Sequence, residues 1–244
     1  MDLQDWIDNF VRHFTLNFIA DDRWRFMLDG LMVTLRITFF ALVFGTVIGI
    51  IISIVRSTYD KNADKMRPGL GRAILWFFNA ICKIYLTVIR GTPVVVQLMI
   101  FYFVILISIR SGVLIAIIAF SINAGAYIAE IFRSGIMSVD IGQFEAGRSL
   151  GFNYIQTMRY IIIPQAFKVI LPTLANEFIV LLKETAIVGY VAVQDITKAG
   201  HIIGGRTYSW FMPLMAVALV YLILVMFFTK LVSILERRLR RNER

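Results

Sequence analysis

Apolar residues occur in long runs along this chain, and shorter polar segments separate the runs. A helix needs about 20 mainly apolar residues to cross the hydrocarbon core of a bilayer, at about 1.5 Å per residue. Five runs approach or exceed that length, so the pattern predicts an all-α membrane protein with five transmembrane helices. The predicted spans are residues 37–55, 93–109, 113–131, 169–193 and 211–229.

The start of the second span is predicted from its capping residues. Thr92 is a favourable N-cap and Pro93 suits the first helical position, so the span is expected to begin there. The apolar residues before it, from Ala73 onward, contain Lys83. We expect them to form a helix that lies at an angle on the inner side of the membrane.

Basic residues are concentrated in two polar segments, and cytoplasmic segments of membrane proteins carry an excess of lysine and arginine. The segment 57–72 holds Lys61, Lys65, Arg67 and Arg72 against Asp60 and Asp64. The C-terminal tail holds Lys230, Arg237, Arg238, Arg240, Arg241 and Arg244. Both segments are predicted to be cytoplasmic, which places the N-terminus outside and the C-terminus in the cytoplasm.

This topology also accounts for the net charge of +9. No basic surface with interleaved aromatic residues lies outside the apolar runs, so a nucleic-acid partner is not expected. The composition agrees with a membrane protein, because 59% of the residues are hydrophobic, more than a soluble domain of this length usually carries.

Residues 1–27 are predicted to form an amphipathic helix that precedes a transmembrane domain of residues 28–244. The first residues are acidic, so they lack the basic region of a cleaved signal peptide. The apolar residues follow the three-four spacing of one helix face. They are Leu3, Trp6, Ile7, Phe10, Val11, Phe14 and Phe18. We expect this helix to lie in the outer membrane interface, and packing of the same face against the spans is the alternative that the pattern leaves open.

The longest polar interval between spans runs over residues 133–168. Ser138 and Asp140 are favourable caps for a short helix, and Gly151 suits the left-handed residue that ends one. Asn153 and Gln156 have the spacing of a capping box that opens the next helix. Two short helices joined at a glycine corner are therefore predicted outside the membrane. Such an elbow fits a rigid lever for a partner or a plain connection between spans.

The third span carries polar residues on one face. Asn123, Tyr127 and Glu130 are spaced by four and three residues, which places them together on a helix. Gly125 and Ala129 form a pair of small residues suited to close contact with another helix.

The fourth span carries ionisable residues, each of which costs about 2.5 to 3.5 kcal/mol at mid-membrane unless something compensates it. Glu177 and Glu184 are seven residues apart and share a face, while Asn176 and Lys183 lie on the neighbouring stripe. Contact with a substrate and pairing with charges on other spans both remain open. If this face meets that of the third span, its acidic excess suits a cationic or strongly polar substrate.

Residues typical of enzymes are missing from the sequence. It contains no Walker phosphate-binding loop and no zinc-ligand spacing, and His13 and His201 stand apart from any cysteine or carboxylate constellation. Cys82 is the only cysteine, which excludes an internal disulfide. The chain is therefore not expected to be an enzyme or to hold a metal or cofactor itself.

A motif lies within the polar interval 133–168. Glu145, Ala146 and Gly147 are followed by three residues, Gly151, nine residues, Ile161, one residue, Ile163 and Pro164. This spacing resembles the "EAA" loop of permease subunits of ABC importers, which reads E-A-A, three residues, G, nine residues, I, one residue, L-P. Gly147 and Ile163 depart from that pattern and keep the size class. Three further stretches resemble permeases of polar amino-acid importers in order and spacing: residues 90–97, 123–133 and 176–186.

The resemblance implies a type I ABC importer permease architecture in the plasma (inner) membrane of a prokaryote. It implies a second permease subunit, identical or different, two cytoplasmic ATPase subunits that bind ATP and Mg, and an external amino-acid-binding protein. The expected ATPase-coupling residues are Glu145, Ala146, Gly147, Gly151 and Pro164. The expected substrate-binding residues are Glu177, Glu184, Asn123, Tyr127, Glu130 and Lys183.

The alternative reading is an ATP-independent secondary transporter or channel for a small polar solute. Such a carrier has no need of the long inner loop, and no internal repeat of the inverted-repeat carriers is visible in the sequence.

Overall fold

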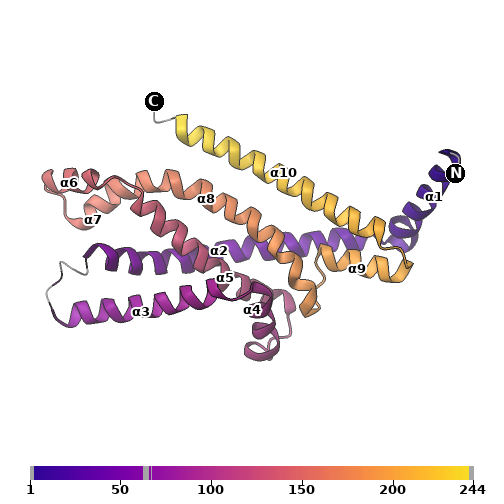
Figure 1. The fold of residues 1–244 in the computed structure, drawn as a ribbon, viewed down its shortest axis with the longest axis horizontal. Coiled ribbons are helices and arrows are strands. Elements are labelled where there is room, and N and C mark those ends of the chain that lie inside the picture. The colour runs from indigo at the N-terminus through magenta and orange to yellow at the C-terminus, as the bar shows by residue number, and fades with distance from the viewer. Residues whose placement is uncertain (1–2, 63–65, 67, 242–244) are drawn as a thin grey trace.

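The computed structural model of the protein describes residues 3–62, 66 and 68–241. All secondary structure in these residues is helical, which confirms the all-α prediction. Figure 1 shows an elongated bundle with α6 and α7 at one end and α1 and α9 at the other. Several residues used in the charge argument lie outside the described residues: Asp64, Lys65, Arg67 and Arg244.

Among the residues that the structure describes, five helices are long and apolar enough to cross a membrane, so the predicted number of spans is confirmed. They are Trp24–Lys61, Leu70–Gly91, Gly112–Met137, Tyr154–Val191 and Phe211–Leu239. The first and fourth contain 38 residues each, about 57 Å at 1.5 Å per residue. Because the hydrocarbon core is about 30 Å thick, both project well beyond it.

The spanning helices carry the labels of Figure 1. They are α2 (Trp24–Asn62), α3 (Leu70–Gly91), α5 (Gly112–Met137), α8 (Ile163–Glu184) and α10 (Phe211–Arg241). In the fourth span, α7 (Tyr154–Thr157) and the π-helical turn η4 (Met158–Ile162) precede α8, and the tight 3-10 turn η5 (Thr185–Val191) follows it.

The predicted position of the second span is wrong, because the spanning helix is α3 and not the segment after Pro93. That segment contains only the seven residues of α4 (Val94–Ile100) and the five of η3 (Phe101–Ile105), about 18 Å of helix. Thr92 ends α3, and its hydroxyl donates to the Val88 carbonyl at 2.8 Å instead of capping α4. Lys83, whose side chain is exposed, does not interrupt the helix.

Helix α5 lies at the centre of the bundle. About two thirds of its apolar stretch is buried, against 6% in α3 and 11% in α10. The predicted close contact at Gly125 and Ala129 is confirmed, since both are buried and a β-carbon on Gly125 would stand 2.8 Å from Ile48 Cγ2 of α2. From α2, a β-carbon on Gly49 would stand 2.7 Å from Ile128 Cγ2 of α5. Small residues therefore bring α2 and α5 together.

The end of the bundle opposite α6 and α7 is formed by α9 and the N-terminal segment (Figure 1). Helix α9 spans Ile196–Thr207, and buried Asp195 caps it by accepting from Thr197 N at 3.2 Å and Lys198 N at 2.8 Å. The N-terminal segment consists of α1 (Leu3–Phe14) and the short turns η1 (Thr15–Ile19) and η2 (Ala20–Asp22).

Candidate coupling elbow and translocation path

The predicted elbow begins with α6 (Ile141–Ser149), the short helix after α5. The Asp140 side chain caps α6 by accepting from Gly142 N at 2.7 Å, which confirms one predicted cap. Ser138 instead ends α5, and its hydroxyl donates to the Gly135 carbonyl at 2.8 Å.

Gly151 forms the corner of the elbow, with φ of 79° in the left-handed region. Two hydrogen bonds close the turn: Phe152 N donates to the Gly147 carbonyl at 3.0 Å, and Gly151 N donates to the Arg148 carbonyl at 2.9 Å. This pair is the Schellman arrangement that ends many helices, and it needs a left-handed residue at this position. The role predicted for the backbone of Gly151 is therefore confirmed.

The helix after the corner begins with the predicted capping box. Asn153 N donates to Gln156 Oε1 and Gln156 N donates to Asn153 Oδ1, both at 2.9 Å. The second of the two predicted short helices is α7, with four residues, and it continues through η4 into α8 as part of one helical run, Tyr154–Val191. Pro164 lies in the first turn of α8 and has no N–H to donate, and the wider π turn of η4 immediately precedes it.

The motif residues divide between those that shape the elbow and those that face outward. Gly147 is buried against α7, and a β-carbon there would stand 2.8 Å from Thr157 Cγ2. Glu145 and Ala146 are exposed. Alanine in place of Gly147 would therefore push α6 away from α7, while Glu145 and Ala146 are free to contact another protein.

A cavity of about 560 Å³ lies between α6 and the end of α2. Its lining includes Asp60 and Lys61 of α2 and Phe144, Glu145 and Arg148 of α6. The Lys61 ammonium lies 3.5 Å from the centre of the Phe144 ring, a cation–π contact that joins the two helices. Movement of α6 can therefore reach α2 directly.

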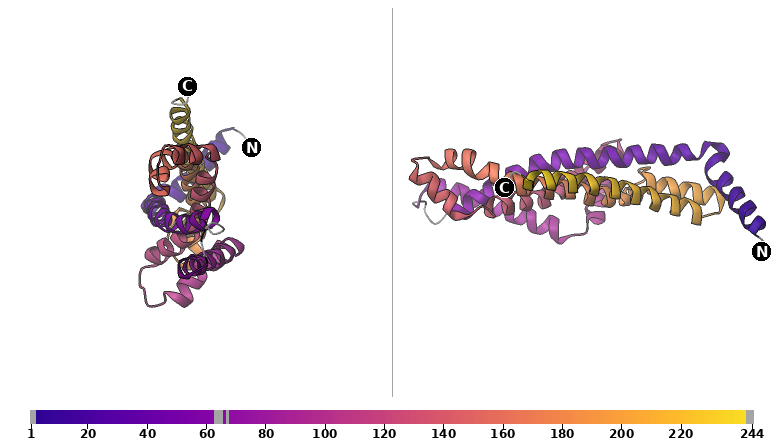
Figure 2. Two further views of the ribbon diagram at one scale, coloured as in Figure 1. Left: turned by 90° about the vertical axis from the view of Figure 1, so that its left-hand side faces the viewer. Right: turned by 90° about the horizontal axis from the view of Figure 1, so that it is seen from above.

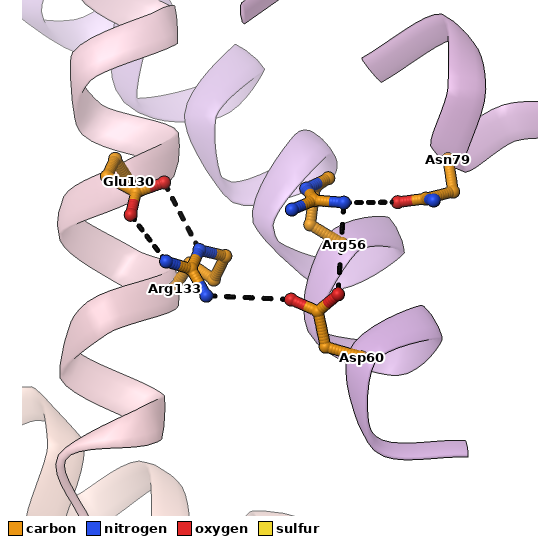
Figure 3. A network of polar contacts seen from close by, with 5 residues as sticks. All are labelled: Arg56, Asp60, Asn79, Glu130 and Arg133. Atoms are coloured by element: carbon orange, nitrogen blue, oxygen red, sulfur yellow. Dashed lines mark hydrogen bonds and ion pairs between the residues drawn. The ribbon is translucent and has the colours of Figure 1, made fainter. Parts of the chain in front are cut away.

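Glu130 belongs to a polar network that joins three spans (Figure 3). Its carboxylate accepts from Arg133 Nη2 at 2.6 Å and from Arg133 Nε at 3.1 Å. Arg133 also pairs with Asp60 of α2 at 3.5 Å, and Asp60 pairs with Arg56 at 3.8 Å. Arg56 donates to Asn79 Oδ1 of α3 at 2.6 Å. Glu130 therefore has a structural partner beside the start of the elbow segment.

Asn123 is buried, and its Nδ2 donates to Gln97 Oε1 of α4 at 2.9 Å. Gln97 Nε2 in turn donates to the Ile89 carbonyl and to Thr92 Oγ1, both at 2.7 Å. The two amides thus hold α4 against α5 and the end of α3. Gln97 was missed in the sequence, although its polarity within the apolar run 93–109 was a usable signal.

Replacing Asn123 with leucine should lower the thermal stability of the purified protein. The buried Gln97 oxygen would lose its donor, a loss of about 1 to 3 kcal/mol for an unsatisfied buried polar group. The control is Asn176→Leu on α8, where the side chain is exposed and forms no hydrogen bond within the described part of the chain. The thermal unfolding midpoints of the two variants are measured in the same detergent. Equal midpoints would contradict the role given to Asn123.

The remaining predicted site residues are Tyr127 on α5 and three ionisable residues on α8. The Arg90 guanidinium lies 5.7 Å from the ring centre of Tyr127, which is 38% exposed. On α8, Glu177 and Glu184 are half-buried and Lys183 is exposed. Within the part of the chain that the structure describes, none of these three forms a hydrogen bond or ion pair.

The sequence left open whether the polar faces of α5 and α8 meet. The helices pack on each other, yet no hydrogen bond or ion pair among the described residues connects the polar residues of one to those of the other. Asn123 and Glu130 are held by structural partners, whereas the carboxylates of Glu177 and Glu184 are available. Glu184 is also the last residue of α8, where the helix tightens into η5.

Comparison with known proteins identifies the architecture. Residues 69–241 match the family described as "Binding-protein-dependent transport system inner membrane component". The chain belongs to this family. The match covers α3 to α10 and therefore includes both the elbow and the polar residues of α5 and α8.

Relatives of the chain within this family are named as amino-acid permeases. The putative glutamine transport system permease protein GlnP of Rickettsia bellii (strain RML369-C) is 38% identical over 88% of this chain and 93% of its own length. The arginine transport system permease protein ArtQ of Bacillus subtilis (strain 168) is 36% identical over 89% and 94%. The chain also resembles a solved structure, the crystal structure of an amino acid ABC transporter with histidines, with a TM-score of 0.77 and 38% identity over 88% and 94%.

Membership of this family settles the general role of the chain. It is a multi-pass membrane permease subunit of an ATP-driven ABC importer. The expectation that it is not an enzyme is confirmed by these relatives, because they are permease subunits and ATP hydrolysis lies on separate subunits.

Proposed function

We propose that this permease subunit carries a polar amino acid into the cell across the plasma (inner) membrane of a prokaryote. The observation that carries the proposal is the 38% identity, over 88% of the chain, to a solved amino acid ABC transporter. The relatives named for glutamine and arginine transport point to the same class of substrate. The acidic residues of α8 suit the ammonium group of such a substrate.

The polar side chains of α8 support a second permease subunit in the complex. Glu177, Lys183 and Asn176 lie at least partly on the surface of a single chain. Leaving ionisable groups against lipid costs about 2.5 to 3.5 kcal/mol each at mid-membrane. A second subunit, a copy or a paralogue, would cover this face, and the translocation path would run between the two subunits.

The elbow would bind an ATPase subunit on the cytoplasmic side. Two permease subunits would then hold two ATPases, which bind ATP and Mg, while an external binding protein delivers the amino acid at the other end. Exposed Glu145 and Ala146 would contact the ATPase, and Gly147, Gly151 and Pro164 would hold the shape of the elbow. Because ATP is hydrolysed on the ATPase subunits, the permease would contribute conformational change rather than catalysis.

The helical run from α7 to α8 gives the coupling a physical route. It joins the elbow at Tyr154 to Glu184 without a break in the chain of helical turns. A displacement of α6 and α7 would therefore shift the polar residues of α8, and the contacts of Lys61 and Arg133 would carry it to α2 and α5. ATP binding and hydrolysis would alternate the path between outward-facing and inward-facing states.

Co-purification tests the proposed assembly. The tagged subunit should be expressed with the proteins encoded beside it and purified in mild detergent. We expect an ATPase and a second permease to remain bound, and we expect the amino-acid-loaded binding protein to stimulate ATP hydrolysis. Purification of a permease without any ATPase under conditions that preserve its fold would contradict the proposed partners.

The orientation predicts which positions an impermeant thiol reagent can reach. Cys82 is first replaced with serine, because it is the only native cysteine. Single cysteines at Tyr208, which is 92% exposed at the α9 end, and at Ser149 in α6 should then be labelled from opposite sides of the membrane. Tyr208 should react in intact cells and Ser149 only after permeabilisation. Reaction of both in intact cells would overturn the orientation.

A further inference from the structure

Helix α1 stands apart from the bundle and keeps its apolar face uncovered. None of its residues is buried, and Figure 2 shows it turning away from the long axis at the α9 end. The aromatic rings of α1 and that of Phe18 in η1 form a continuous row, with centroid distances of 5.7 Å for Trp6 to Phe10, 6.4 Å for Phe10 to Phe14, and 5.2 Å for Phe14 to Phe18. The opposite face of α1 is polar and includes Asp5 and Asp8.

The direction of α1 is set by a hydrogen-bonded clamp at Asn17, whose side chain is fully buried. Asn17 Nδ2 donates to the His13 carbonyl at 2.7 Å and to Ser209 Oγ at 3.2 Å, and Asn17 Oδ1 accepts from Thr207 Oγ1 at 2.7 Å. The clamp therefore fastens the end of α1 to the turn between α9 and α10. A helix attached only through its chain connection would not need a buried, hydrogen-bonded amide just after its last turn.

The clamp lies at the level of an aromatic belt. Trp24 begins α2, and Tyr208 and Trp210 lie in the turn before α10, where all three are exposed. Tryptophan and tyrosine concentrate at the boundary between hydrocarbon and water. Because Asn17 bonds to the residues that flank Tyr208, α1 leaves the bundle where this boundary is expected.

We infer that α1 is an anchor lying in the membrane interface, with Trp6, Phe10 and Phe14 in contact with lipid. Lipid suits its exposed face better than a protein partner does, because the first exposed turns of α2 beside the belt, at Trp24, Leu28 and Met32, belong to the surface that lipid must cover. The acidic residues of α1 oppose attraction to anionic headgroups, so burial of the apolar face drives the contact. The assignment of α1 to the outer leaflet rests on the proposed function, whereas the contact of α1 with lipid does not.

Fluorescence quenching in vesicles tests this inference on the full chain, purified with its partners. In the Cys82→Ser background, single cysteines at Phe10 and at Asp8 carry the same environment-sensitive dye on opposite faces of α1. The dye at position 10 should emit at shorter wavelength and be quenched by spin-labelled lipid at least about threefold more than the dye at position 8. The difference in quenching between positions 10 and 8 should be the same in phosphatidylcholine vesicles and in vesicles that also contain phosphatidylglycerol.

Three outcomes would overturn the inference. Equal weak quenching at both positions would show that α1 stays in water. Protection of position 10 that appears only after the binding protein is added would show that a protein covers the face. Quenching that requires phosphatidylglycerol would show that charge drives the contact. Because none of these readouts depends on ATPase binding, failure of the anchor is distinguishable from failure of the proposed importer.

A separate variant tests whether the clamp orients α1. Asn17→Ala removes the donors and the acceptor that hold α1 to Thr207 and Ser209 while leaving the aromatic row unchanged. The contrast between dyes at positions 10 and 8 should shrink by about half or more, because α1 can then rotate about its base. An unchanged contrast would show that lipid alone sets its orientation and that the clamp does not.

Discussion

Replacing Gly151 with valine should lower both binding-protein-stimulated ATP hydrolysis and transport while leaving the spans inserted. Gly151 has φ of 79°, and a residue with a β-carbon pays about 1 to 2 kcal/mol in this conformation. No atom lies within 4 Å of the position such a β-carbon would take, so the penalty comes from the backbone alone. Release of that strain would open the turn between α6 and α7 and misplace the surface that meets the ATPase.

The measurement is binding-protein-stimulated ATP hydrolysis and amino-acid uptake in reconstituted vesicles. A penalty of about 1 to 2 kcal/mol corresponds to a 5- to 30-fold drop in the population of the coupled elbow. Gly151→Asn should retain more activity, because asparagine tolerates the left-handed region. The matched control is Gly205→Val in α9, where a β-carbon also meets nothing within 4 Å and φ is not positive. Equal activity of the two valine variants would remove the elbow from the coupling route.

Replacing Glu184 with glutamine should abolish or redirect uptake without disrupting the complex. The substitution keeps the shape of the side chain and removes its charge. A hydrogen bond to a charged group contributes about 1.5 to 3 kcal/mol, so losing one to the substrate ammonium should lower uptake about tenfold or more. Basal ATP hydrolysis and binding of the ATPase should remain, because Glu184 has no partner among the described residues.

Glu130→Gln is the contrasting variant. Its carboxylate is paired with Arg133 at 2.6 Å, in a network that includes Asp60 of α2 (Figure 3). Loss of the Glu130 carboxylate should therefore reduce the thermal stability of the subunit and the assembly of the complex together with uptake. Uptake assays and size-exclusion profiles of both variants decide between the two roles. Failure of Glu184→Gln to assemble would assign Glu184 to structural pairing and remove it from the path.

Local chemistry explains what the sequence could predict. The caps at Asp140 and Asn153 and the left-handed turn at Gly151 depend on neighbouring residues only, so their patterns were sufficient. The number of spans follows from run lengths, which the bilayer thickness makes informative. Close packing at Gly125 followed from its spacing with Ala129, although the partner helix α2 did not.

Contacts between distant parts of the chain explain what the sequence could not give. Asn123 and Gln97 are 26 residues apart, and nothing near Asn123 indicates that an amide from α4 will meet it. Asp60 reaches Arg133 only after α2 and α5 have packed together. The second span lies earlier than predicted because α3 continues through the exposed Lys83 and ends at Thr92, whose spacing with Pro93 resembles the start of a helix. The first two contacts form only through tertiary packing, whereas the third miss is a misread local signal.

The most direct test of the account is amino-acid uptake by vesicles that contain the purified complex. The permease, its ATPase and its binding protein are reconstituted together, and uptake of glutamine, arginine and other amino acids is followed with ATP supplied to the ATPase side. The account predicts accumulation that requires ATP, the ATPase and the loaded binding protein at once. Uptake of the same solute by the permease alone, with no ATPase and no ATP, would instead establish an ATP-independent carrier and contradict the central claim.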